Sequence, residues 1–154
     1  VSARVPSQNL WCPDPGQPAA YDKRIRSAGG IDLFLLAAGA SDGLVAFNPP
    51  RSTLEEGTRV VELAESTRRD NMHSFPDFRA LDEVPRHGVT VGLGTIAGLS
   101  RSVVMVLHGP GKRSAVARLT ALQSFDPSFP ASVIFGCRDA RLVVDAASSQ
   151  ASEV

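Results

Sequence analysis

An aspartate and a glycine follow the most apolar run of this sequence. The run Ile31–Ala37 predicts a strand covered on both faces of a parallel sheet. Asp42 and Gly43 come just after it, on a loop beyond the strand's end, where open α/β sheets bind their ligands. Two nearby positions at which a proton-transfer site could use polar groups hold Leu44 and Pro49. The loop therefore has the layout of a site, but it has lost part of the acid-base chemistry that such a site would use.

A lysine follows a second glycine turn. The segment Gly109-Pro110-Gly111 sharply ends the buried run Ser102–Leu107, and Lys112 then opens a stretch with an apolar stripe at helical spacing. Backbone N–H groups at a helix start and an ammonium group both favour a bound anion. Spacing alone leaves two interpretations of Lys112 open, a contact to a phosphate and a solvated lysine in the first helical turn.

Strand and helix patterns alternate around these two loops. The apolar spacing predicts strands at Asn9–Cys12, Ile31–Ala37, Val60–Ala64, Val89–Val91, Ser102–Leu107 and Arg141–Val144. Helices are predicted over Ala19–Ala28, over Ser66–His73 with Ser66 as the cap, and over Lys112–Leu122, with shorter helical turns at Asp77–Asp82 and Ile96–Leu99. Ala131–Phe135 fits a helical turn or a strand, and Ala146–Val154 a frayed polar tail. This alternation favours an α/β fold, a doubly wound and mainly parallel sheet with flanking helices.

Composition limits the size and the partners of the protein. With 154 residues, 43% of them hydrophobic, the chain suits a single domain over residues 1–154. Its 16 basic and 16 acidic side chains cancel, which predicts no nucleic-acid partner and no anionic membrane surface. No apolar run approaches the ~20 residues that span a bilayer, and the N-terminus lacks the pattern of a signal peptide. We expect a cytoplasmic protein.

The cysteines, the remaining histidines and Asp32 suggest no further chemistry. Cys12 and Cys137 stand outside any CxxC or Cys/His spacing, so two reduced thiols are favoured over a disulfide. His87 and His108 have no partner at metal-binding spacing, and Asp32 is expected to cap the start of its strand. We expect no metal and no cofactor.

Several segments, in order along the chain, resemble one enzyme family. They are GIDLFLLAAGASDGLVAFNPP, TRVVEL, STRRDN, VPRHGVTVGLGTI, VMVLHGPGK and PASVIF. From about Pro6 to Ala146 the chain is similar to the second half of glucosamine-6-phosphate deaminases, also called isomerases. The resemblance implies the doubly wound α/β fold of the group that includes 6-phosphogluconolactonase, with this chain as the C-terminal portion of the domain. It also implies a phosphorylated amino sugar as the ligand.

The resemblance implies an active site around Asp42. In the family this loop carries an aspartate, a glycine and a histidine, then an asparagine and a glutamate. The aspartate and glutamate support the histidine, which handles the proton of sugar ring opening. Asp42 matches as a catalytic residue, and Gly43 and Asn48 match as substrate-binding residues. The histidine and glutamate positions hold Leu44 and Pro49, and such general acid-base catalysis typically contributes ~10²–10⁴-fold.

The resemblance also implies contacts to the sugar phosphate. It assigns Lys112 to the phosphate and Thr95, in GLGT, to the neighbourhood of the sugar, where a plain turn is the alternative. The family's arginine near the phosphate falls at His73, which can donate to an anion when it is protonated.

Two further positions match an effector site. Ser52 and Arg59 correspond to residues that, in hexameric members, help to bind a phosphorylated effector between subunits. The lysine of that site is Val61 here, and an exposed charge at a strand edge is the alternative for Arg59. A homo-oligomer is therefore a possible assembly.

The first half of the family's domain has no counterpart in residues 1–9. That half supplies a threonine- and serine-bearing loop for the phosphate and an aspartate that moves a proton between C1 and C2. The sheet is accordingly expected to expose one edge. Two functions remain open. The first is a glucosamine-6-phosphate deaminase/isomerase-like protein of carbohydrate metabolism, and the second is a non-catalytic or degenerate sugar-phosphate-binding protein.

Overall fold

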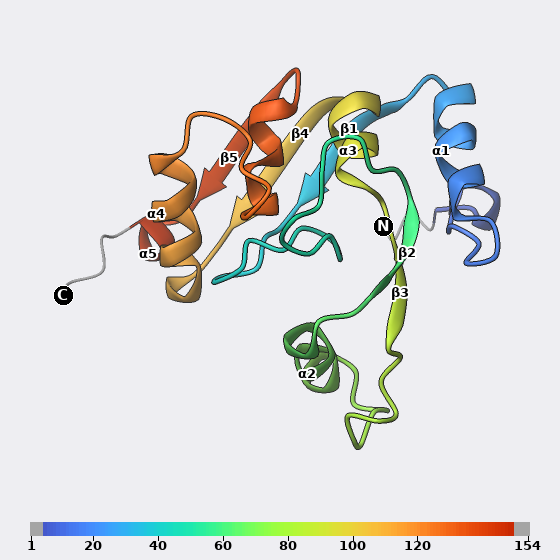
Figure 1. Cartoon of the computed structure of the whole chain (residues 1–154), viewed down its shortest axis with the longest axis horizontal. Coiled ribbons are helices and arrows are strands. Elements are labelled where there is room, and N and C mark those ends of the chain that lie inside the picture. The colour runs from blue at the N-terminus through green and yellow to red at the C-terminus, as the bar shows by residue number, and fades with distance from the viewer. Residues whose placement is uncertain (1–4, 150–154) are drawn as a thin grey trace.

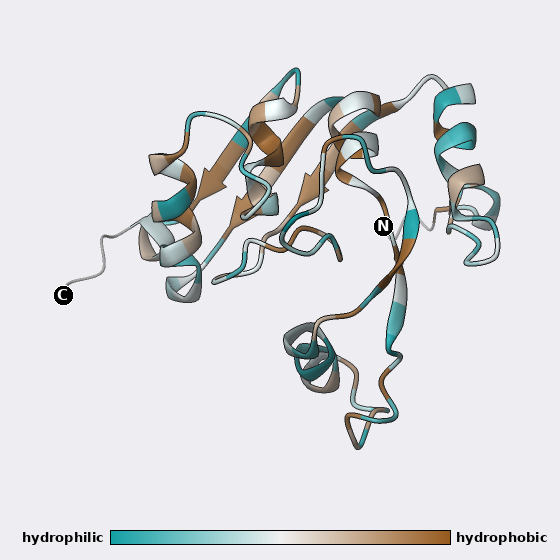
Figure 2. Cartoon of the chain, viewed as in Figure 1, coloured by the Kyte–Doolittle hydropathy of each residue, from teal (hydrophilic) through white to brown (hydrophobic). Residues whose placement is uncertain are grey.

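The chain folds around a short parallel sheet (Figure 1) in a computed structural model that describes residues 5–149, apart from the side chain of His73. The sheet has the order β1-β4-β5, with β1 at Ile31–Leu36, β4 at Ser100–Leu107 and β5 at Ala140–Val144. Both pairs of neighbours are parallel. Figure 2 shows these strands as predominantly hydrophobic, as the sequence predicted. The prediction of an α/β fold with a mainly parallel sheet is confirmed.

Helices occupy most of the connections. The α-helices are α1 Pro18–Ser27, α2 Glu65–Ser74, α3 Leu93–Leu99, α4 Arg113–Ala121 and α5 Ala146–Ser149. Three 3₁₀ segments accompany them, η1 Ser7–Asn9, η2 Pro110–Lys112 and η3 Pro130–Gly136. The stretch that fitted either a helical turn or a strand is therefore helical, as part of η3. The predictions for α1, α2 and α4 are confirmed to within two residues at each end, and α3 begins three residues earlier than predicted.

The hydrophobic core lies on one face of the sheet. Side chains alternate between the two faces of a strand, so Phe34 and Leu36 of β1 share a face with Val103 and Met105 of β4. These side chains pack with apolar residues of α3, α4 and η3, namely Leu93, Ile96, Ala115, Leu119 and Val133. The opposite face keeps large apolar side chains exposed. Within residues 5–149, one of the two helical layers of a doubly wound sheet is therefore present.

Two other strands form a separate antiparallel pair. They are β2 Arg59–Glu62 and β3 His87–Thr90. Both were predicted as strands, and they pair with each other rather than with the parallel sheet. In Figure 1, α2 lies beyond one end of this pair.

Three predicted elements differ from the structure. Residues 10–12 join no strand, because the chain turns through η1 and then runs extended without a partner. Residues 77–82 contain turns but no helix. Residues 146–149 are not frayed, because α5 is held at its start by the Asp145 carboxylate, which accepts from the Ser148 amide at 2.9 Å. Residues 150–154 lie outside the described part of the chain.

Two local predictions are also wrong. Asp32 caps nothing, since its exposed carboxylate pairs with Arg101 across the sheet at 2.8 Å. Ser66 does not cap α2, whose N-cap is Ala64, and it lies inside the first turn.

Both cysteines are free thiols, with Cys12 exposed and Cys137 partly buried. None of the helices within residues 5–149 is long and apolar enough to cross a membrane.

Candidate ligand cleft

A cleft of about 530 Å³ opens at the carboxyl end of β1. It is lined by residues 34–42 together with Leu44, Ala46, Ser66, Thr67, Asp70, Asn71 and Lys112. Asp42 and Lys112 are thus brought into one cavity from loops that follow different strands. The cavity lies at the end of a parallel sheet, where α/β proteins bind ligands, and the predicted roles of Asp42 and Lys112 stay predictions.

The loop that carries Asp42 is fixed by close packing around two glycines. Asp42 Oδ1 accepts from the backbone N–H of Leu44 at 3.0 Å. A Cβ on Gly39 would lie 2.1 Å from that same oxygen, so only glycine allows the carboxylate this position. Gly43 has φ +65°, and a Cβ there would lie 2.3 Å from the Phe129 ring. Gly43 is buried behind the cleft and is not part of its lining.

Lys112 reaches the same loop from the other side. It is the N-cap of α4, and the left-handed Gly109, at φ +87°, turns the chain toward it. Its Nζ donates to the carbonyl of Ala38 at 2.7 Å. Two residues later, the hydroxyl of Ser114 donates to the carbonyl of Ala40 at 2.7 Å. The start of α4 is therefore attached to the Asp42 loop, and no side chain caps its first amides.

Helix α2 forms a polar wall that the sequence analysis did not identify. Ser66, Thr67, Asp70 and Asn71 all line the cleft. They stand at i, i+1, i+4 and i+5, so they share one face of the helix. That spacing was a usable signal within the STRRDN segment, which otherwise served only as a family resemblance. His73 also belongs to α2, but its side chain lies outside the described residues, so the predicted phosphate contact stays a prediction.

The described lining carries two carboxylates and one ammonium group, from Asp42, Asp70 and Lys112. Leu44 places an apolar side chain in the lining, beside Asp42. The cleft can accordingly attract a cationic group at its carboxylates and an anionic group at Lys112. No cluster of three or more His, Cys, Asp or Glu side chains suited to a metal ion occurs in residues 5–149, the His73 side chain excepted.

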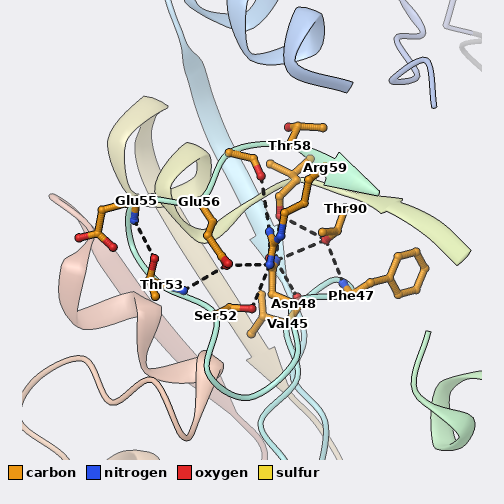
Figure 3. Close-up of polar contacts among 12 residues, drawn as sticks. Val45, Phe47, Asn48, Ser52, Thr53, Glu55, Glu56, Thr58, Arg59 and Thr90 are labelled. Carbon is orange, nitrogen blue, oxygen red and sulfur yellow. Dashed lines mark hydrogen bonds and ion pairs between the residues drawn. The ribbon is translucent and has the colours of Figure 1, made fainter. Parts of the chain in front are cut away.

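Asn48 and Arg59 belong to a partly buried network outside the cleft (Figure 3). Asn48 has no exposed surface. Its Nδ2 donates to the carbonyl of Val91 at 2.8 Å, and its Oδ1 accepts from Arg59 Nη1 at 2.8 Å. Arg59 Nη2 also donates to Ser52 Oγ at 3.1 Å and pairs with Glu56 at 2.7 Å. The structure therefore places the predicted substrate residue Asn48 and the predicted effector residues Ser52 and Arg59 in one intramolecular network.

Thr95 lies apart from the cleft as well. It is nearly buried on α3 and lines a different hollow of about 200 Å³, next to Asp22 and Gly57. Close backbone packing explains the neighbouring glycine, because a Cβ on Gly94 would lie 2.4 Å from the carbonyl of Leu54. The predicted sugar contact of Thr95 stays a prediction.

The largest pKa shifts occur away from the cleft. A hydrogen bond from the Ser148 hydroxyl, with a second from the Gly109 amide, lowers the pKa of Asp145 from 3.8 to about 2. Burial raises the pKa of the Cys137 thiol to about 11. Asp145 therefore contributes to the anchoring of α5, and Cys137 remains a neutral thiol at physiological pH.

Comparisons with known proteins find relatives that share one name. The glucosamine-6-phosphate deaminase of Rhodococcus jostii (strain RHA1) is 42% identical over 147 residues, which cover 95% of this chain and 54% of that protein. The glucosamine-6-phosphate deaminase of Bifidobacterium longum (strain NCC 2705) is 41% identical over 126 residues, which cover 82% of this chain and 45% of that protein. No protein-family model matches the chain.

Solved structures agree with these relatives. A monomeric glucosamine-6-phosphate deaminase superposes with a TM-score of 0.78 at 29% identity, over 87% of this chain and 53% of its own. The 6-phosphogluconolactonase of Trypanosoma brucei superposes with a TM-score of 0.61 at 21% identity, over 96% of this chain and 57% of its own. This likeness shows a shared fold. The chain thus spans about half the length of the proteins it matches. By its sequence relatives and its fold, the chain belongs to the glucosamine-6-phosphate deaminase family.

Proposed function

We propose that the cleft binds a phosphorylated amino sugar, and that the chain is the C-terminal portion of a glucosamine-6-phosphate deaminase/isomerase-like protein. One observation supports this most directly: Asp42 and Lys112, which follow two different strands, line the same cleft. The names of the relatives supply the substrate class, since glucosamine 6-phosphate is the compound that those deaminases are named for.

The charges of the cleft suit a ligand with both signs. A protonated amino sugar phosphate carries an ammonium group and a phosphate. Lys112 favours the phosphate. Asp42 and Asp70 favour the ammonium group. A hexose phosphate without an amino group would make the first interaction and lack the second, so we expect the amino sugar phosphate to bind more tightly.

Deaminase activity has a direct test. Ammonia release from glucosamine 6-phosphate is measured with the chain alone and with the chain supplemented by the segment of the Rhodococcus jostii deaminase that lies outside its match. The expected result is release by the combination, abolished by Asp42→Asn. Asp14→Asn is the matched control, because Asp14 also accepts from the amide two residues on, in an exposed turn. Absence of ammonia at every pH would contradict catalysis.

Non-catalytic binding is the second candidate, and Leu44 favours it. The side chain of Leu44 lines the cleft at the position that the resemblance gives to a histidine, and leucine has no exchangeable proton. A binding protein should then be stabilised against heat by glucosamine 6-phosphate but not by glucosamine, without ammonia release. Equal melting temperatures with and without glucosamine 6-phosphate would contradict this candidate.

A further inference from the structure

A second hollow, of about 350 Å³, opens at the end of the parallel sheet away from Asp42. Its lining comes from the starts of all three strands, namely Gly29-Gly30 before β1, Ser100 and Arg101 at the start of β4, and Arg138 shortly before β5. In Figure 1 this is the end of the sheet opposite the arrowheads. β1, whose six residues span roughly 20 Å, lies between this hollow and the Asp42 loop. The hollow is therefore a site separate from the ligand cleft.

Three arginines surround this hollow, which we call the arginine hollow. Arg26 comes from α1, Arg101 from β4, and Arg138 from the loop after η3. All three residues are exposed, and none of the described lining residues is acidic. Arg101 pairs with Asp32 at 2.8 Å, but both side chains are exposed and such a pair adds little stability. Arg26 and Arg138 make no ion pair within the described part of the chain, so the hollow carries positive charge that these residues do not neutralise.

Local structure explains only one of these arginines. Arg26 lies in the last turn of α1, where a cation is favourable because of the helix dipole. Asp22 stands four residues before it and lines a neighbouring hollow together with Arg26, which adds an attraction along the helix. The Asp22 carboxylate is already engaged, however, because it accepts from the backbone N–H of Thr58 at 2.8 Å. Neither argument accounts for Arg138, which reaches the same hollow from a distant part of the chain.

The lining also contains a buried hydroxyl without a hydrogen-bond partner. Ser100 is only 8% exposed, and its Oγ makes no hydrogen bond to any described residue. A buried polar group in this state costs free energy, so it is rare in folded proteins. Because Ser100 lines the arginine hollow, an anion bound there would supply the acceptor that the hydroxyl lacks. The unpaired hydroxyl and the arginines thus point to the same kind of ligand.

We propose that the arginine hollow binds the phosphate group of a small phosphorylated molecule. A guanidinium group binds an oxyanion through paired N–H donors. A carboxylate offers two oxygens, whereas a phosphate monoester offers three, which three arginines and a hydroxyl can approach from different sides. The volume of about 350 Å³ is near the lower end for small-molecule sites, which leaves room for the rest of such a molecule. This site is independent of the sugar phosphate proposed for the ligand cleft.

The test uses the ¹⁵N-labelled 154-residue chain and inorganic phosphate as the probe. Amide chemical shifts are followed by NMR during a titration at constant ionic strength, with acetate in a parallel titration. We expect saturable shifts at Gly30 and Ser100 with phosphate and much smaller shifts with acetate. Each amide reports its own surroundings, so phosphate bound beside Lys112 gives a separate set of shifts. Failure of this proposal is therefore distinguishable from failure of the proposed function.

Substitutions locate the phosphate. Arg138→Gln should weaken the affinity measured at these amides by about tenfold, because it removes a charge-assisted donor. Ser100→Ala should weaken it by about two- to fivefold, yet leave the urea midpoint unchanged or raised, because the hydroxyl that it removes is unsatisfied without the anion. Arg141→Gln is the matched control and should bind like the wild type, since Arg141 is also exposed and lies on β5 outside the hollow.

Three results would overturn the proposal. The first is a set of saturable shifts confined to the ligand cleft, or shifts at the arginine hollow that do not saturate. The second is equal binding of acetate and phosphate. The third is wild-type affinity in either Arg138→Gln or Ser100→Ala.

Discussion

Gly43 determines the position of Asp42 through its backbone rather than through a contact with the ligand. Gly43→Ala should destabilise the fold by about 2–4 kcal/mol, because it combines left-handed strain with overlap against the Phe129 ring. Gly29→Ala is the matched control: its φ is +91°, but a Cβ there would meet nothing within 4 Å. Urea denaturation measures the free energy of unfolding of both variants. Equal losses of stability would show that Phe129 does not restrict this loop.

Arg59 illustrates how one charged side chain can stabilise a loop. Removing it in Arg59→Ala would leave the buried Asn48 Oδ1 without a donor, and an unsatisfied buried acceptor costs about 1–3 kcal/mol. We expect a loss of about 2 kcal/mol in urea denaturation. Arg101→Ala, which breaks an exposed ion pair, should change stability by less than about 1 kcal/mol. If both losses were the same, the network in Figure 3 would not be what holds this loop.

Sequence patterns identified those cleft residues that come after a strongly apolar strand. Asp42 and Lys112 follow apolar strands directly, so their common location follows from the fold. Asp70 and Asn71 were missed because their helix carries no apolar stripe to indicate its orientation. Asn48 was assigned to the substrate by resemblance, whereas three of its four hydrogen-bond partners, Thr90, Val91 and Arg59, are distant in the sequence and no local pattern connects them.

At the scale of elements, α5 depends on one carboxylate. The Ser148 side chain, together with the amides of Gly109 and Ser148 that donate to the Asp145 carboxylate, lowers the pKa of Asp145 from 3.8 to about 2. A carboxyl with a lowered folded-state pKa contributes stability above its unfolded pKa, and this is lost as the pH falls through the folded value. Protection of the α5 amides should therefore decline between about pH 4 and pH 2.

The variant Asp145→Asn isolates this effect. It cannot titrate, so its α5 amides should exchange fast at neutral pH already and should change little over the same acid range. Hydrogen exchange followed by mass spectrometry measures both proteins. Identical pH dependence in the wild type and the variant would contradict a role for the Asp145 carboxylate.

Among the strands, the sequence predicted best those with long apolar runs. β1 and the second part of β4, from Val103 to Leu107, consist almost entirely of Ile, Leu, Val, Phe and Met, and their packing in the sheet agrees with the strand preference of these residues. The helix α5 was missed because four residues show no periodicity, and it is stabilised by Asp145 and by the Ser148 hydroxyl, which donates to the carbonyl of Leu107 at 2.8 Å. Such a contact joins distant parts of the chain and leaves no trace in the local pattern.

At the scale of the whole molecule, the cleft and the exposed face have one common element. β1 contributes to the ligand cleft with its carboxyl end and to the exposed face with Leu33 and Leu35. The fold class was predictable from strand and helix alternation. The sequence did not predict that only one face of the sheet is covered, because an apolar strand has the same sequence pattern whether or not its second face is covered.

Calorimetric titration of the chain with glucosamine 6-phosphate tests the central claim most directly. Lys112→Ala should weaken binding by about 10- to 100-fold, as expected for the loss of a charge-assisted contact of about 1.5–3 kcal/mol. Lys23→Ala is the matched control, because Lys23 is the other lysine of the sequence and lies exposed on α1, outside the cleft lining. Our account predicts that this control binds like the wild type. Equal affinity for Lys112→Ala and the wild type, or no binding by either, would contradict the assignment of the cleft to a phosphorylated amino sugar.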